Sequence, residues 1–238
     1  MAAESEKPPL GMTMPPVPAG IEIPPEPADV GARTLSVAAR LLAGATVFFF
    51  LAFVFAYFYL RSIDQNHFWL PSAPQLKEQN LIHISLAPNQ ALGGVFVACL
   101  VLSVLASIAA GRQMKQRSRS WLAPATAALV LGIGAVAAQC IEFVVQKFGP
   151  TDGAFASVFC AWLGFYLIAV MATMYWLETQ IATELRARRV PARELDEETG
   201  ADIADPDRLI APALDAAVFY WSFLGIVGVL TYVTLYLL

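Results

Sequence analysis

The sequence predicts an all-α integral membrane protein, a bundle of five transmembrane helices with a cytoplasmic N-terminus and its C-terminus outside. Hydrophobic residues make up 58% of the 238 residues and charged residues only 14%, against about 45–50% and about 25% in an ordinary soluble domain. The apolar residues form uninterrupted blocks of about 20, the length of helix that crosses a hydrocarbon core. These blocks are predicted to be helices because they lack the alternating polar residues of barrel strands.

The predicted spans are the five apolar blocks that contain no Lys, Arg, Asp or Glu. They are Leu41–Leu60, Ala91–Ala110, Trp121–Ile141, Ala154–Leu177 and Ala216–Leu238. The basic residues outside the blocks set the orientation, since twelve fall on the side of the N-terminus and three on the other side. The positive-inside bias therefore predicts a cytoplasmic N-terminus.

The first span is unusually aromatic and ends at a charge. Its sequence FFFLAFVFAYFYLR, residues 48–61, carries aromatic rings all round the helix. Ala45, Ala52 and Ala56 form a narrow stripe of small residues, which predicts the face that approaches sister helices. Arg61 is expected at the outer boundary, where its charge reaches water.

At the outer end of the third span lie Gln139, within the span, and Glu142, directly after it; they are three residues apart and so share one helix face. Two interpretations of Glu142 stay open: it extends to the lipid headgroups, or it makes a buried hydrogen bond to another helix. The same span has two small-xxx-small pairs, an arrangement that lets helices approach closely. The pairs are Ala128/Gly132 and Gly134/Ala138.

The cysteines lie one each in the second, third and fourth spans, as Cys99, Cys140 and Cys160. No CxxC pairing occurs, so we expect buried thiols that pack as small apolar residues. The two histidines, His67 and His83, both fall in the first loop outside the membrane. Their spacing fits no metal motif, and surface histidines are favoured over a shared external metal.

The polar segments divide the chain. Residues 1–34 are predicted to be a Pro-rich cytoplasmic tail, because eight prolines fall within residues 1–30. Residues 35–238 are predicted to be the membrane domain. Its fourth loop, 179–212, is cytoplasmic, begins as a helical extension and then becomes acidic. This loop is either a solvated surface or a docking segment for a partner.

The residues exclude several kinds of chemistry for this chain. The sequence has no phosphate-binding glycine loop, no nucleophile elbow and no charge in the middle of a span that indicates an ion pathway. No span has a histidine with which to ligate haem. We therefore expect no catalytic, metal or cofactor site in the chain itself and no nucleic-acid partner.

The order of several partial motifs resembles the five-helix form of subunit III of the haem–copper oxidases, the cytochrome c oxidase subunit III family. In that family an aromatic first span closes in Tyr-Phe-x-x-Arg, as at Tyr57 and Arg61, and a Trp-Pro-Pro follows, compared with Trp69–Pro71 here. The third span is similar to its Gln-x-x-Glu pattern at Gln139 and Glu142. Further matches are Leu131, Gly132, Phe143, Ser157, Phe159, Gly164, Phe165, Tyr220, Trp221 and Phe223. The resemblance covers about residues 38 to 238.

The departures from the family pattern all replace ionisable groups. The membrane glutamate of the family falls on Thr46, and two histidines of its fourth matching helix fall on Tyr166 and Ala169. A histidine and an aspartate of its last helix fall on Ser222 and Gly225. A role that depends on those groups is therefore not expected here.

The resemblance implies an accessory subunit in the bacterial cytoplasmic (inner) membrane, part of a cytochrome c or quinol oxidase but without a redox centre of its own. Subunits I and II are the implied partners, with a cytochrome c or cytochrome bc complex as a further one. Haem and copper would be in partner subunits, and bound phospholipid is expected. The expected structural, partner or lipid contacts are Tyr57, Arg61, Trp69, Gln139, Glu142, Tyr220, Trp221, Ala52 and Ala56.

Two other hypotheses remain. The chain could be a subunit III-like accessory of a nitric-oxide reductase or another respiratory complex, which the neutral positions favour. A stand-alone transporter ranks below both, because transporters usually have repeated halves and polar sites at the membrane midplane.

Overall fold

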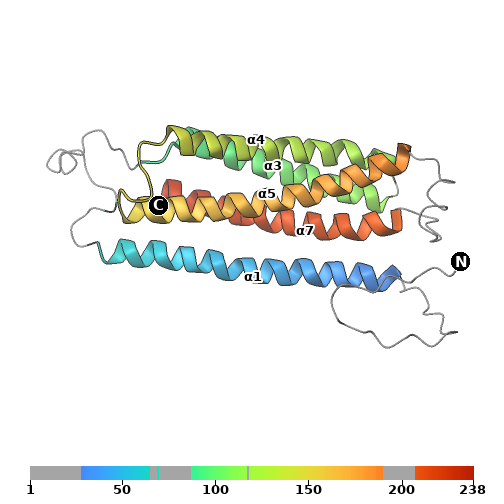
Figure 1. Ribbon diagram of the computed structural model, residues 1–238, viewed down its shortest axis with the longest axis horizontal. Coiled ribbons are helices and arrows are strands. Elements are labelled where there is room, and N and C mark those ends of the chain that lie inside the picture. Colours follow the sequence, from blue (N-terminus) through green and yellow to red (C-terminus); the bar gives the residue numbers. More distant parts are fainter. Residues whose placement is uncertain (1–27, 65–68, 70–86, 117, 190–206) are drawn as a thin grey trace, which may run out of the picture.

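The structure, a computed structural model, describes residues 28–64, 69, 87–116, 118–189 and 207–238 (Figure 1). All regular structure in these residues is helical. The long helices are α1 (Ala28–Ser62), α3 (Gln90–Lys115), α4 (Leu122–Val145), α5 (Ala154–Arg189) and α7 (Asp207–Tyr232). A 3₁₀ turn, η1 (Arg119–Trp121), precedes α4, and a π-helical segment, η2 (Val233–Leu237), continues α7.

All five helices are long and apolar enough to cross a membrane, which confirms the predicted fold class. Their bounds differ from the predicted ones mainly at the helix ends that were predicted to be cytoplasmic. The segment 28–34, predicted as tail, is the start of α1, and α5 extends through the first part of the predicted loop to Arg189. α7 begins at Asp207, before the predicted span. The rest of the tail and the central part of the acidic loop lie outside the described residues.

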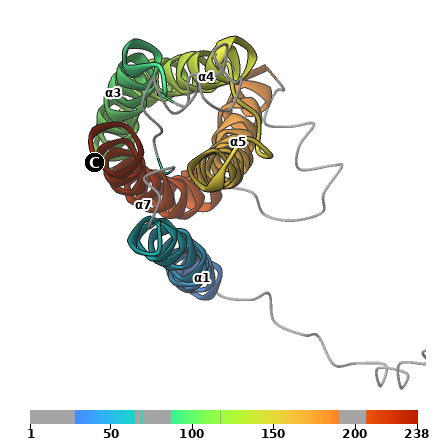
Figure 2. The same ribbon diagram turned by 90° about the vertical axis from the view of Figure 1, so that its left-hand side faces the viewer.

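Four of the helices form a closed ring and the fifth lies outside it (Figure 2). In the ring α3 packs against α4, α4 against α5, α5 against α7, and α7 back against α3. α1 packs onto the outside of α7 and α5. Helices that follow one another in the sequence run antiparallel (Figure 1). α1 packs mainly against the last two helices, α5 and α7, and not against the helix that follows it in the sequence.

The interior of the ring is filled by large side chains in two clusters. One includes Leu100, Trp162, Tyr166 and Leu224, each at most 2% exposed. The other lies around Trp121. Because these side chains fill the ring, the bundle has a packed core rather than a central channel along its described length.

The packed face of α1 is not the predicted alanine stripe. Ala52 and Ala45 are exposed, and Ala56 is partly buried. The buried face instead runs through Ala39, Ala43, Thr46, Phe50 and Tyr57. Residues that recur at this spacing share one side of a helix. The predicted stripe was wrong because the packed face is a different side of the helix, which has Ala39 and Ala43 near its start and the larger Phe50 and Tyr57 further along.

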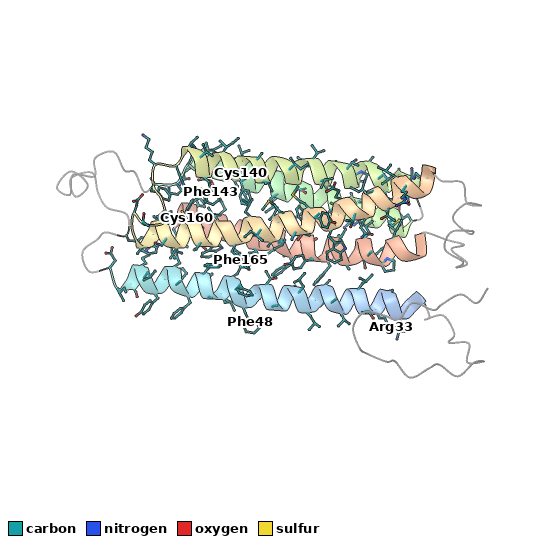
Figure 3. The ribbon with its side chains drawn as sticks, viewed as in Figure 1. Arg33, Phe48, Cys140, Phe143, Cys160 and Phe165 are labelled. Atoms are coloured by element: carbon teal, nitrogen blue, oxygen red, sulfur yellow. The ribbon has the colours of Figure 1, made fainter. Side chains whose placement is uncertain are left out.

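Phe50 packs against α5. Its ring meets the rings of Phe165 and Tyr166 edge-on, at centroid distances of 5.6 and 5.7 Å. Edge-to-face aromatic pairs of this kind add about 0.5–1.5 kcal/mol beyond the area that they bury. Phe165 projects from α5 on the side of α1 (Figure 3).

The small residues of α4 behave as predicted. Ala128 and Gly132 are buried. A Cβ atom at Gly132 would lie 3.3 Å from Met174 Sδ and 3.3 Å from Trp221 Cζ2. The absence of a side chain at Gly132 thus lets α4 approach α5 and α7 closely.

Candidate functional site

Glu142 is the centre of the most developed polar cluster in the described bundle, and its side chain is fully buried. Its Oε2 accepts hydrogen bonds from the Tyr236 hydroxyl and from Gln139 Nε2, the latter at 3.1 Å. Its Oε1 accepts from the backbone N–H of Asn89 at 3.2 Å. Three donors converge on one carboxyl group, so Glu142 joins α4 to the start of α3 and to η2.

Local structure positions each of these donors. Asn89 is the N-cap of α3, and its side chain accepts from the backbone N–H groups of Ala91 and Leu92. The N-terminal end of a helix carries a partial positive charge, which stabilises a nearby carboxylate. Tyr236 can approach α3 because Gly93 lacks a side chain: a Cβ there would lie 2.7 Å from Tyr236 Cδ1. The Glu142 cluster, meaning Glu142, Gln139, Tyr236 and Asn89, is thus built around a close contact of two helices.

The structure decides between the two interpretations of Glu142 in favour of the buried hydrogen bond. Gln139 lies beside it as the helical spacing predicted. Tyr236 and Asn89 were not predicted as partners, because they lie 94 and 53 residues away in the sequence. An asparagine directly before an apolar span is a common N-cap, and that is the one sequence signal from which Asn89 could have been found.

A second polar connection joins the two clusters of the core, since Trp221 belongs to the first cluster and Ala128 to the cluster around Trp121. Trp221 Nε1 donates to Ser103 Oγ at 3.1 Å, and Ser103 Oγ donates to the carbonyl oxygen of Ala128 at 2.5 Å. Trp221 and Ser103 are both buried. One hydroxyl therefore links α7, α3 and α4 in the interior.

Replacing this hydroxyl should destabilise the bundle measurably. In Ser103→Ala the Trp221 indole N–H loses its acceptor, and we expect the free energy of unfolding to fall by about 1 kcal/mol, the scale of hydrogen bonds between membrane helices. Unfolding in mixed micelles measures this. The matched control is Ser107→Ala, because Ser107 is equally buried on the same helix but bonds only to Val104 O within its own turn. Equal losses for the two variants would contradict the role of the link.

Three of the neutral residues at positions that are ionisable in the oxidase pattern make hydrogen bonds in the bundle. Thr46 Oγ1 lies 2.9 Å from Tyr220 Oη, which ties α1 to α7. The Tyr166 hydroxyl donates to Leu224 O at 2.7 Å. Ser222 bonds within its own helix to Val218 O. Hydroxyl groups that join helices therefore occupy two of the five positions, Thr46 and Tyr166.

Arg61 lies at the end of α1 and is exposed, as predicted for a residue at the boundary. Its Nη1 donates to the main-chain oxygen of Leu238 at 2.9 Å, which the sequence did not indicate. Tyr57, one turn earlier, packs edge-on against Trp69 at 5.1 Å, and Trp69 meets Phe155 at 5.6 Å. Tyr57, Trp69 and Phe155 thus fasten the chain after α1 to the start of α5.

The cysteines and histidines give no metal centre in the described part of the chain. No group of three or more His, Cys, Asp or Glu that could hold a metal occurs there, while His67 and His83 lie outside the described residues. Cys99 and Cys160 are partly buried, but Cys140 is exposed on α4. The expectation of three buried thiols was therefore wrong for Cys140, which lies on an outward face where apolar surface meets lipid.

Two grooves open on the outside of the bundle. One of about 310 Å³ lies between α1 and α5 and has Thr46 and Tyr220 among its lining residues. The other, of about 500 Å³, is lined by residues from the start of α1, the end of α3 and the start of α7. Both include α1, the helix that stands outside the ring.

Fold and contacts define the chain as a multi-pass all-α membrane protein in which several buried polar side chains connect helices. Comparison with models of protein families found no match, and comparison with curated protein sequences found none either.

Proposed function

We propose that this chain is a non-catalytic accessory subunit of a bacterial respiratory terminal oxidase, a cytochrome c or quinol oxidase. In this role it packs beside the catalytic subunit I, with subunit II in the same complex, and supports assembly and sustained turnover. Haem and copper belong to the partner subunits. The chain works as a rigid membrane scaffold in the cytoplasmic membrane.

The observation that carries the proposal is the outer face of α1. Phe48 and Phe55 are 76% and 69% exposed there, and Phe48 points away from the other helices (Figure 3). Lipid contact alone needs only apolar groups, whereas large aromatic anchors are enriched in protein interfaces. A face of this composition on the one helix outside the ring suits a larger membrane subunit.

The interior supports a scaffold rather than a transporter. The hydroxyls of Ser103 and Tyr166 and the indole of Trp221 are bonded to groups on neighbouring helices, so they rigidify the bundle. Transport requires polar groups that face a pathway and can change partners. The contacts of Ser103, Tyr166 and Glu142 instead hold fixed partners on other helices.

A second candidate keeps the fold and changes the complex. The chain would then be the subunit III-like accessory of a nitric-oxide reductase or of another respiratory assembly. The observation in its favour is that Thr46 and Tyr166, at positions ionisable in the oxidase pattern, are neutral and bonded within the bundle.

Purification of the tagged chain from its own membranes tests both candidates. We expect a haem-bearing subunit with a copper centre to co-purify, and the haem spectrum to remain unchanged when the chain is deleted while the turnover lifetime of the complex shortens. A nitric-oxide-reducing haem subunit in its place would identify the second candidate. An isolated chain, or a complex with unchanged composition and lifetime after deletion, would reject the role.

The orientation gives a separate prediction. With the N-terminus cytoplasmic, the turn before α4 faces the cytoplasm and the turn before α5 faces outside. In a cysteine-free background, a membrane-impermeant maleimide should label Asp152→Cys in intact cells but Ser120→Cys only after lysis. Both positions are exposed, so accessibility is matched. The reversed labelling pattern would invert the topology.

A further inference from the structure

The groove between the start of α1, the end of α3 and the start of α7 combines charge with an apolar wall. Its volume is about 500 Å³, and Arg40, Lys115 and Asp215 line it together with Ala39, Val218 and Phe219. The three charged residues come from three different helices. They meet at the end of the bundle opposite to the Glu142 cluster.

The charges facing this groove leave a surplus of one positive charge. Lys115 Nζ lies 2.7 Å from Asp215 Oδ1, and both side chains are more than half exposed. A lysine ammonium has three donors, so this pair leaves two available. Arg40 is exposed and makes no hydrogen bond or ion pair with the described residues, so its guanidinium is available in full.

The sequence predicts that the groove lies at the depth of the lipid headgroups. Arg40 directly precedes the uncharged run 41–60, and Asp215 directly precedes the uncharged run 216–238. Charges at the ends of apolar spans lie at the membrane interface. The apolar wall of Val218 and Phe219 continues along α7 toward the hydrocarbon core.

We propose that this groove binds the headgroup of an anionic phospholipid, with the phosphate between Arg40 and Lys115 and the upper acyl carbons against Val218 and Phe219. Guanidinium groups recognise phosphate through paired N–H donors. One phosphodiester charge without a headgroup amine matches the single surplus positive charge. A soluble phosphate would gain nothing from the apolar wall. The inference is independent of the proposed function.

Native mass spectrometry of the purified full chain tests this proposal, with phosphatidylglycerol and phosphatidylcholine of identical acyl chains offered in equal amounts. We expect a preference for phosphatidylglycerol that falls about tenfold in Arg40→Gln, the loss expected for one charge-assisted hydrogen-bond pair. Asp215→Asn, which frees Lys115, should raise retention. Ser36→Trp, which fills the groove without changing its charge, should lower it.

The matched control is Arg186→Gln, which removes the same charge at the same end of the bundle from α5, a helix that does not line the groove. Equal retention of the two lipids, or equal losses in Arg40→Gln and Arg186→Gln, would overturn the proposal. Displacement of the lipid by inorganic phosphate alone would identify a site for soluble anions and would also overturn it.

Discussion

Glu142→Gln should be among the most destabilising conservative substitutions in this bundle, with a loss of about 2–3 kcal/mol in the free energy of unfolding. A carboxylate only accepts hydrogen bonds, and its two oxygens meet three donors here. A glutamine side chain has the same shape, but it replaces one acceptor with an NH₂ group. That group would face other donors in a site that is fully buried.

Reversible unfolding in mixed micelles, read by tryptophan fluorescence, measures this loss. The matched control is Glu178→Gln, since Glu178 is exposed on α5 and the same change there should cost less than about 0.5 kcal/mol. Tyr236→Phe removes one of the three donors and should cost less than Glu142→Gln. In a double-mutant cycle the two changes should be coupled. Additive effects, or a Glu142→Gln variant as stable as the unmodified protein, would rule out the network.

Gly228→Ala should destabilise by about 2–3 kcal/mol, although alanine is the better helix former. A Cβ at Gly228 would overlap both Leu100 Cδ2 and the Tyr166 hydroxyl. Neither side chain has room to withdraw, because Leu100 is fully buried and Tyr166 is 1% exposed. Movement of Tyr166 would also break its hydrogen bond to Leu224 O.

Gly164→Ala is the matched control, because a Cβ there meets nothing within 4 Å. Gly164→Ala should be neutral or stabilising by up to about 1 kcal/mol. The difference in unfolding free energy between the two variants therefore measures the cost of the overlap at Gly228. The double variant Gly228→Ala/Tyr166→Phe should recover part of the loss, since the hydroxyl oxygen is gone. Equal effects at Gly228 and Gly164 in the same unfolding assay would refute the predicted overlap.

The spans could be read from the sequence because a lipid environment demands about 20 uncharged residues in a row. The sequence does not show which face of each span packs against the other helices. In a soluble helix polar residues mark the outside, but here lipid-facing and protein-facing surfaces are both apolar. The packed face of α1 was therefore misassigned to Ala52, while Phe50 and Tyr57 make the contact.

Only the part of the candidate site that lies within one helix was predictable from the sequence. Gln139 and Glu142 were found because their spacing within one helix is a local property. Tyr236 and Asn89 complete the cluster only through the meeting of α3 with η2. That meeting depends on the absent side chain of Gly93. Nothing local in the sequence indicates which tyrosine a glycine on another helix will accommodate.

The position of α1 outside the ring has a consequence for biogenesis. Its contacts are with α7 and α5, and 170 residues separate its end at Ser62 from the end of α7 at Tyr232. At about 5–20 residues per second, the ribosome needs about 10–35 s to make that segment. During this interval α1 is already in the bilayer without its main partner, and the hydroxyl of Thr46 lacks Tyr220. A helix that is made before the whole ring is therefore among the last to find its place.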